Sequence, residues 1–426
     1  MEEELKVFVG IDWGREEHQV CVLDALGKVI FERKIVHEVS ALRKIIDEVI
    51  GLAGGDPAGV GVAIEVPHGV IVETLVDADL KVFSINPKQL DRFRDRFTVA
   101  GAKDDRRDAH ALASALRTDR RAFWPVAIGA PKWIELREES HNYEDLRADF
   151  TRLTNRLREL VTRYYGQLLT IGDVTEPWIW ELFERAPDPQ AAQKIRLSSI
   201  EIILRRHHIR RIGADEVREK LRAASFTAAD GVREGVVRRI ESLLPQLRAV
   251  MAQLKESQRN IDRLLDRCGQ ADTEDVSSGQ DRPPDEHSDV AILRSLPGVG
   301  RIVSAAVLAE AHAVLLHGER STLRALGGIA PVTKRSGKSL LVVQRRRACN
   351  PRLSNAFYHW GRTAVQHDEH CRQHYARLRQ RGHGHARAIR GVVDRLLDVL
   401  LRMLKDRTLY DANRRTAAPL VLVPAA

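Results

Sequence analysis

The sequence predicts an α/β domain at the N-terminus, a helical and coiled-coil-like middle, and a mostly α-helical C-terminal domain. Short apolar runs alternate with amphipathic segments over the first 125 residues, which is typical of alternating strands and helices. Two long charged stretches, residues 142–169 and 236–268, carry apolar residues at helical spacing. Such helices form either a coiled coil, antiparallel or between chains, or a plain bundle within one chain.

A polar and acidic stretch follows the second long helix. It has too few apolar side chains to form a core, so we expect a flexible linker there. With 426 residues the chain is long enough for several separate cores. The predicted parts are the α/β domain at 1–125, the helical segment at 126–269, the linker at 270–289, the C-terminal domain at 290–410 and a tail at 411–426.

The order of elements in the N-terminal domain indicates its topology. A strand is expected over residues 5–14, followed by a strand hairpin that turns at Ala25–Gly27. Helix, strand, helix, strand and helix then follow, at 40–54, 59–67, 69–79, 81–89 and in the segment after residue 103, with Asn86-Pro87 closing the last of these strands. Three strands followed by this alternation is the order of a ribonuclease-H-like fold, in which carboxylates gather at the ends of the central strands and on the last helix.

Four carboxylates occupy those places. Asp12 ends one apolar run and Glu65 closes another, while Asp105 and Asp108 are three residues apart and share a helix face. Clustered carboxylates repel one another unless cations neutralise them. Mg²⁺ takes oxygen ligands of this kind, and two such ions roughly 4 Å apart assist phosphoryl transfer. The four residues therefore predict a two-metal Mg²⁺ site, with Asp104 either replacing Asp105 or capping the helix.

The charge of the chain is unevenly distributed. The formal net charge is +9, yet residues from 291 onward hold 24 Lys and Arg against 8 Asp and Glu, and the first 290 residues carry −7. A basic C-terminal part favours a polyanionic partner, DNA or RNA, over the alternative of a solvated basic surface. The four cysteines form no CxxC pair, and no apolar segment has the length of a membrane span, so we expect a cytoplasmic protein.

The basic part contains two candidate nucleic-acid motifs. Residues 293–310 resemble a helix-hairpin-helix in which Gly298 and Gly300 let backbone N–H groups approach a phosphate; the alternative is a tight turn between helices. Further along, Ser336 lies between a cation and a glycine and is a candidate nucleophile, with Ser339 as its rival. The cationic residues expected to neutralise nucleic-acid phosphates are Lys334, Arg335, Lys338, Arg345, Arg346, Arg347 and Arg352.

In combination these motifs resemble the serine-DEDD insertion-sequence transposases, the family that includes Piv-type DNA invertases and bridge-RNA-guided recombinases. The resemblance rests on Asp12, Glu65, the Asp-x-x-Asp-Ala of residues 105–109, a Leu-Pro-Gly-Val-Gly turn, a Gly-Ile-Ala-Pro stretch and a Ser-Gly pair. It implies a RuvC-like domain whose carboxylates bind Mg²⁺, and a transposase domain whose nucleophile, Ser336, becomes covalently joined to DNA.

The resemblance also implies partners. These are donor and target DNA, a structured bridge RNA from the same element, and further copies of the chain in a dimer or tetramer that shares active sites, acting in a prokaryotic cytoplasm at the nucleoid. The acidic linker and the segment near residue 180 are long for the family. Two alternatives stay open: a RuvC-like hydrolytic endonuclease of the junction-resolvase type that uses water as the nucleophile, and a non-catalytic nucleic-acid-binding scaffold.

Overall fold

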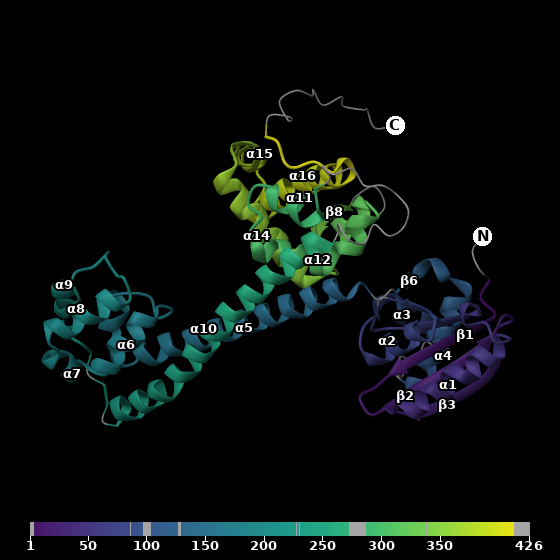
Figure 1. The fold of residues 1–426 in the computed structure, drawn as a ribbon, viewed down its shortest axis with the longest axis horizontal. Coiled ribbons are helices and arrows are strands. Elements are labelled where there is room, and N and C mark those ends of the chain that lie inside the picture. The colour runs from purple at the N-terminus through teal and green to yellow at the C-terminus, as the bar shows by residue number, and fades with distance from the viewer. Residues whose placement is uncertain are drawn as a thin grey trace. The chain divides into compact units, whose positions relative to one another are not determined.

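The computed structural model describes residues 4–85, 87–96, 104–126, 129–226, 228–229, 231–271, 287–336 and 340–412. The chain divides into two compact units, residues 1–129 and 130–426, which are described separately (Figure 1). Most of the predicted linker, residues 272–286, and the tail from residue 413 lie outside the described residues.

The first unit is built on a six-stranded mixed sheet with the order β3-β2-β1-β4-β5-β6. Its strands are β1 (Val7–Trp13), β2 (Glu17–Asp24), β3 (Val29–Val36), β4 (Val60–Ile64), β5 (Lys81–Ser84) and β6 (Trp124–Pro125). β1 pairs antiparallel with β2 and parallel with β4, and β4 pairs parallel with β5. This topology confirms the predicted α/β domain and is consistent with a RuvC-like domain.

Helices cover both faces of this sheet, which explains why β1 and β4 are continuous apolar runs rather than alternating ones. The helices are α1 (Val39–Leu52), α2 (Val70–Asp77), α3 (Pro87–Arg94) and α4 (Asp105–Thr118). α1 and α2 bury Ile45 and Leu75 in the core on one face, and α3 and α4 bury Leu90 and Leu112 on the other.

Two features of this unit differ from the sequence analysis. The strand predicted to be closed by Asn86-Pro87 ends at Ser84, and Pro87 opens a helix, α3, that was not predicted, because proline lacks the N–H that a strand ladder needs but fits the first turn of a helix. The two-residue edge strand β6 pairs antiparallel with β5 and was not predicted, since it has no periodicity to recognise.

In the second unit, two long helices pair within the chain. α5 (Pro131–Thr162) and α10 (Val232–Ala271) run antiparallel: Cys268 Sγ lies 3.8 Å from the Lys132 carbonyl, and Gln258 Nε2 donates to Tyr143 Oη at 3.3 Å. Between them in sequence lie α6 (Pro177–Arg185), α7 (Pro189–Lys194), α8 (Leu197–Arg206) and α9 (Ala214–Arg222), whose buried side chains share a core with α5 and α10. The intrachain arrangement is one of those predicted.

The C-terminal part of this unit is a helical bundle with one strand hairpin. Its elements are α11 (Asp289–Ser295), α12 (Arg301–Leu316), α13 (Arg320–Leu326), β7 (Pro331–Ser336), β8 (Leu340–Arg345), α14 (Pro351–His367), α15 (Glu369–Gln380) and α16 (His385–Asp406). The hairpin was not predicted from the sequence. Trp360 and Phe357 of α14 are fully buried in the core of the helical bundle. No helix of the described residues is long and apolar enough to cross a membrane.

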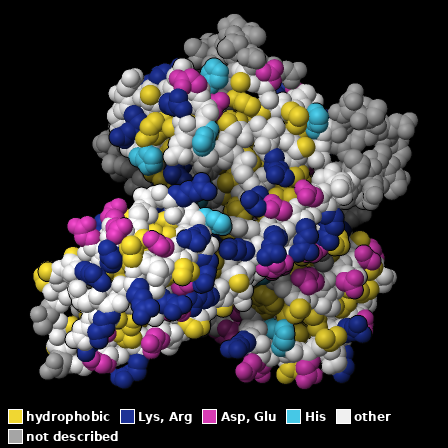
Figure 2. Space-filling model, turned by 60° about the vertical axis from the view of Figure 1, so that its left-hand side comes forward, with side chains coloured by type: hydrophobic (Ala, Val, Ile, Leu, Met, Phe, Trp, Pro, Cys, Tyr) yellow, Lys and Arg dark blue, Asp and Glu magenta, His cyan; other side chains and the backbone are white. Residues whose placement is uncertain are grey.

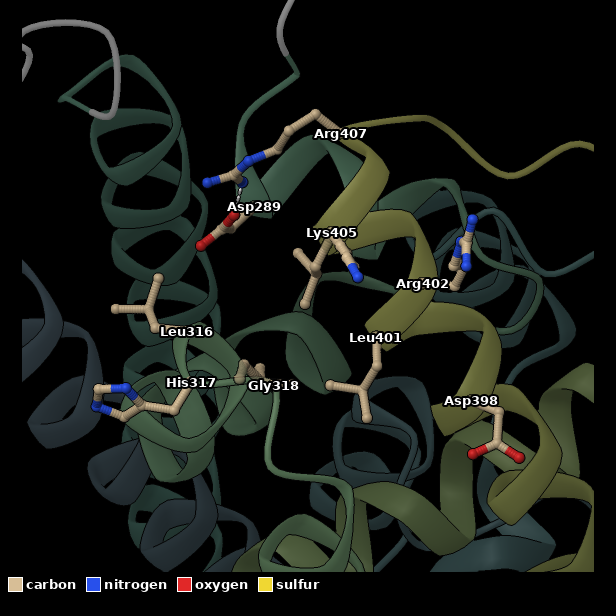
Figure 3. A pocket seen from close by; sticks show the side chains of 11 residues that line it. Asp289, Leu316, His317, Gly318, Asp398, Leu401, Arg402, Lys405 and Arg407 are labelled. Carbon is tan, nitrogen blue, oxygen red and sulfur yellow. Dashed lines mark hydrogen bonds and ion pairs between the residues drawn. The ribbon is translucent and has the colours of Figure 1, made fainter. Parts of the chain in front are cut away.

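A buried carboxylate joins the start of this bundle to its end. Asp289 opens α11 and forms an ion pair with Arg407, the left-handed residue that caps α16 (Figure 3). His312 of α12 lies 3.7 Å from the same carboxylate and stacks on Trp133 of α5. Burial raises the pKa of Asp289, but the hydrogen bonds and charges of His312 and Arg407 outweigh it and hold this pKa below the usual value.

The lowered pKa makes stability pH-dependent. Because the folded pKa of Asp289 is depressed, its contribution is present above the unfolded pKa of 3.8 and is lost as pH falls through the folded pKa. We predict that Asp289→Asn lowers the free energy of unfolding by about 2–3 kcal/mol at pH 7, a loss that shrinks below pH 4. Urea denaturation across pH measures this. Asp398→Asn, which breaks the exposed pair with Arg320, costs less than about 1 kcal/mol. Equal losses of unfolding free energy for the two variants contradict a stabilising role for the buried Asp289 carboxylate.

Candidate active site

Asp12 and Glu65 occupy adjacent positions at the carboxyl ends of two paired parallel strands. Ile11 of β1 and Ile64 of β4 are register partners, and Asp12 and Glu65 are the next residues along each strand. Neighbouring strands lie about 4.8 Å apart. Both carboxylates are partly buried. The sheet therefore brings together two side chains that are far apart in the sequence.

The same two carboxylates face the side of the sheet that α4 covers. Gly10 lies two residues before Asp12 and so shares its face, and a Cβ added to Gly10 would lie 1.9 Å from the Ala109 carbonyl oxygen. Ala63, two residues before Glu65, is buried in the core that contains the inward residues of α4. Asp12 and Glu65 thus point toward the helix that carries the other predicted ligands.

The direction of α4 brings its first turn level with Asp12. Gly10 lies against Ala109 and Ala113, whereas Gly61, beside Phe8 in the sheet, lies against Leu116. The helix therefore runs antiparallel to β1. Two strand residues span about 6.6 Å, the rise of roughly four helical residues, so Asp12 is level with the segment from Asp105 to Asp108. All four predicted carboxylates therefore lie on the face of the sheet that α4 covers, toward the carboxyl ends of β1 and β4.

Within this arrangement Asp108 already has a cationic partner. Arg94 of α3 donates from one nitrogen to both oxygens of Asp108, at 2.9 and 2.8 Å. The Asp108 side chain is only 4% exposed, and that of Arg94 is 20% exposed. A carboxylate this deeply buried requires a counter-charge. Arg94 supplies it, which the sequence analysis missed.

The first turn of α4 separates its other acids. Asp104 caps the helix and accepts a hydrogen bond from the Arg106 backbone N–H at 3.3 Å, as the sequence analysis expected in one of its two alternatives. Asp105 is exposed. Lys34 of β3 has a raised pKa, first because of its hydrogen bond to Glu17 and also because of the negative charge of Asp105. Asp105 therefore lies at the solvent side of the carboxylate set.

The carboxylates do not form a ready-made metal cage. Among the described residues, no group of three or more His, Cys, Asp or Glu side chains is placed to hold a metal ion. Mg²⁺, however, commonly takes only one or two protein carboxylates and completes its shell with water and phosphate oxygens. The adjacent oxygen ligands of Asp12 and Glu65 are a suitable donor set of that size.

The candidate nucleophile lies in the second unit. Ser336 is the last residue of β7, and its backbone pairs with Leu340 across the hairpin. Lys334 and Arg335 precede it in β7, and nothing is described of the side chains of these three residues. Lys338 and Ser339 lie outside the described residues. Their predicted roles stay predictions.

The remaining predicted phosphate contacts have different surroundings. Arg352 is not free, because its guanidinium pairs with Glu144 at 2.9 Å and Asp145 at 3.5 Å, both in α5. Arg345 donates to Ser354 Oγ at 3.3 Å. Arg347 is exposed, and Arg346 is partly buried with its Nε lacking a hydrogen-bond partner among the described residues.

The Pro-Gly-Val-Gly turn between α11 and α12 has a packing role at one of its glycines. Gly298 has a positive φ of 81°, and a Cβ there would lie 2.5 Å from the Ala364 backbone nitrogen of α14. Gly298 therefore allows two helices to approach closely. Gly300 caps α12, and no other atom lies within 4 Å of its Cβ position. Only Gly300 has open space beside it for a ligand.

Comparison with known proteins identifies the class of protein. One family model, described as Transposase, matches residues 9–166, and another, described as Transposase IS116/IS110/IS902 family, matches residues 290–376. The Mini-circle putative transposase for IS117 of Streptomyces coelicolor is 31% identical over the full length of both chains. Putative transposase y4uE of Sinorhizobium fredii is 46% identical over 218 residues, 50% of this chain and 60% of that protein.

An Insertion element IS110 protein of Streptomyces coelicolor, described as an uncharacterized 43.6 kDa protein, is 25% identical over 96% of this chain and 97% of its own. The α/β domain with its carboxylates and the two matching segments define the chain as a transposase. It belongs to the IS110/IS116/IS902 family of insertion-sequence transposases.

We predict that Gly10→Ala destabilises the first unit by about 3 kcal/mol or more, because the new methyl group collides with backbone rather than with a mobile side chain. Denaturant unfolding followed by circular dichroism measures the loss. Gly51→Ala in α1 is the matched control: no other atom lies within 4 Å of its Cβ position, and the change stabilises the protein by about 0.5 kcal/mol. Equal effects of the two substitutions contradict the close packing of α4 on β1.

We predict that Arg94→Gln, measured without divalent cations, lowers the free energy of unfolding by about 3 kcal/mol because it leaves Asp108 buried without its cation. Arg96→Gln is the control, since Arg96 pairs at 3.2 Å with Asp119 in a half-exposed ion pair, and it costs less than about 1 kcal/mol. If both variants unfold at the same urea concentration, Arg94 does not compensate Asp108.

Proposed function

We propose that the protein is a site-specific DNA recombinase of an insertion sequence that cleaves and exchanges strands with Mg²⁺ and a covalent serine–DNA intermediate. The observation that carries this proposal is the position of Asp12 and Glu65, adjacent at the ends of paired parallel strands and facing the helix of Asp105 and Asp108. Membership of a transposase family supports DNA as the substrate.

In this proposal the carboxylates hold the ions and the fold orients them. Asp12 and Glu65 supply oxygen ligands from the sheet, and Asp105 and Asp108 supply them from α4. Bound Mg²⁺ neutralises the charge of the scissile phosphate and lowers the pKa of an attacking oxygen. An ion held by Asp108 would supply the positive charge that Arg94 supplies in this structure, and this would leave the Arg94 guanidinium to contact phosphate.

Ser336 performs the covalent step. Its Oγ attacks the phosphorus of one phosphodiester, a P–O bond to serine forms, the P–O bond to one deoxyribose oxygen breaks, and the serine proton passes to that oxygen through solvent. Because one phosphoester replaces another, the energy of the bond is kept for rejoining. Ser336 and the carboxylates belong to different units, and the resemblance to serine-DEDD transposases supports a dimer or tetramer whose subunits share active sites.

A structured bridge RNA from the same element is the proposed guide. The resemblance to bridge-RNA-guided recombinases and the basic charge from residue 291 onward support a second nucleic acid beside donor and target DNA. Its binding is salt-dependent, because much of the affinity comes from counterion release.

A RuvC-like hydrolytic endonuclease is the alternative function. One observation favours it: Asp12, Glu65, Asp105 and Asp108 all lie within the first unit, so water activated there needs no residue of the second. Ser336 is dispensable in that mechanism. The two functions therefore differ in whether the protein becomes attached to DNA.

We predict that Ser336→Ala removes the protein–DNA adduct seen on denaturing gels and lowers the rate of strand exchange by about 10³-fold or more. The substrate is DNA carrying both ends of the insertion element, supplied with Mg²⁺ and RNA transcribed from its flanks. Ser339→Ala is the matched control and keeps the adduct. Asp12→Asn loses cleavage altogether. Cleavage without any adduct by the Ser336 variant establishes the hydrolytic alternative, and an adduct retained by it excludes Ser336 as the nucleophile.

A further inference from the structure

Net charge alone does not locate a DNA contact on this protein. On the face shown in Figure 2, Lys and Arg side chains are interspersed with acidic ones. Several arginines of the C-terminal part are paired: Arg320 and Arg324 bind Asp394, and Arg352 binds Glu144. A phosphate site is instead expected where arginines converge without carboxylates.

One pocket has that property. It has a volume of about 620 Å³ and lies between the end of β8, the start of α14 and α16. Arg345, Arg347 and Arg390 line it, and no Asp or Glu does. Ser354, Asn355 and Tyr358 of α14 add hydrogen-bonding groups. Its apolar lining residues include Ile329, Phe357, Ile389 and Val393.

The cations of this pocket repel one another. Burial lowers the pKa of Arg390, and the positive charges of Arg345 and Arg387 lower it further. The positive charges are thus held together at a cost in stability. Natural proteins commonly bear such a cost at sites that bind a ligand of opposite charge.

We propose that this pocket binds a backbone phosphate of the DNA strand that is recombined, with Arg345, Arg347 and Arg390 supplying the positive charge. The inference rests on the proposed function and deepens it by naming a contact for the DNA strand. Neither Arg390 nor the pocket was predicted from the sequence. A planar guanidinium donates two parallel hydrogen bonds to phosphate oxygens, and three guanidinium groups together fix the position of the phosphate.

The hairpin relates the pocket to the candidate nucleophile. Arg345 pairs with Pro331 at one end of the β7–β8 hairpin, and Ser336 pairs with Leu340 at the other. Five strand residues span about 17 Å. This equals about five nucleotides of duplex at roughly 3.4 Å each. For a duplex whose axis runs along the hairpin, a phosphate in the pocket lies about five nucleotides from the phosphodiester level with Ser336.

The test uses the full-length protein and a fluorescent DNA duplex carrying one end of the element, titrated at several KCl concentrations. Arg390→Gln is expected to weaken binding about tenfold and to reduce the slope of log Kd against log salt by about one. Arg402→Gln is the matched control on the same helix: Arg402 is 73% exposed and pairs with Asp406, and its loss changes Kd less than about twofold. Arg345→Gln, on a different element, should reproduce the reduced slope.

Each outcome decides the proposal. Arg390→Gln removes a repelled charge, so its thermal midpoint stays at or above that of the parent and unfolding does not explain lost binding. Equal Kd and slope for the Arg390 and Arg402 variants overturn the pocket, as does a loss confined to an RNA duplex of the same sequence. The adduct assay tests the covalent mechanism separately from the pocket. If the adduct requires Ser336 but Arg390→Gln binds DNA as the parent does, only the phosphate pocket is rejected. If Arg390→Gln reduces the salt slope but no adduct forms at Ser336, only the covalent mechanism is rejected.

Discussion

The close contact between α4 and β1 at Gly10 is the constraint on which the carboxylate arrangement depends. No side chain separates the helix backbone from the strand there, so the axis of α4 lies closer to the sheet than ordinary side-chain packing allows. This approach, with the antiparallel direction of the helix, places the first turn of α4 beside the carboxyl ends of β1 and β4. A bulkier residue at Gly10 moves Asp105 and Asp108 away from Asp12 without altering any of the four acids.

The second unit follows a different principle. α5 and α10 contribute residues to two separate cores, one with α6 to α9 and one with the C-terminal bundle. The core with α6 to α9 comes from one continuous stretch, Phe150 to Leu254, whereas the bundle core adds Trp133 and Leu136 to residues from Ile261 onward. The two helices are therefore not a spacer between finished parts, and the bundle that carries the β7–β8 hairpin depends on Trp133 and Leu136 at the start of α5. Changes at Trp133 or Leu136 are therefore expected to destabilise the bundle as well as α5.

Much of the first unit is predictable from sequence, because its strands are apolar runs bounded by turn residues and Asp12 and Glu65 directly follow such runs. The sequence did not predict that Arg94 pairs with Asp108, because the pair depends on how α3 packs against α4 rather than on helical spacing. Gly10 carried a usable signal, since glycine inside a buried strand indicates close backbone approach. The β7–β8 hairpin was missed because β7 is largely polar and cationic, unlike the apolar strands of the first unit. The pocket around Arg390 joins three segments that are separate in sequence, so no local pattern reveals it.

The Arg94–Asp108 pair has a consequence for the stability of the folded protein without a bound metal ion. A buried acid whose counter-charge comes from the polypeptide itself does not require a dissolved ion to remain tolerable in the folded state. If the carboxylates hold Mg²⁺ as proposed, chelating agents are expected to remove the activity and leave the fold intact, and resupplied Mg²⁺ to restore the activity without refolding.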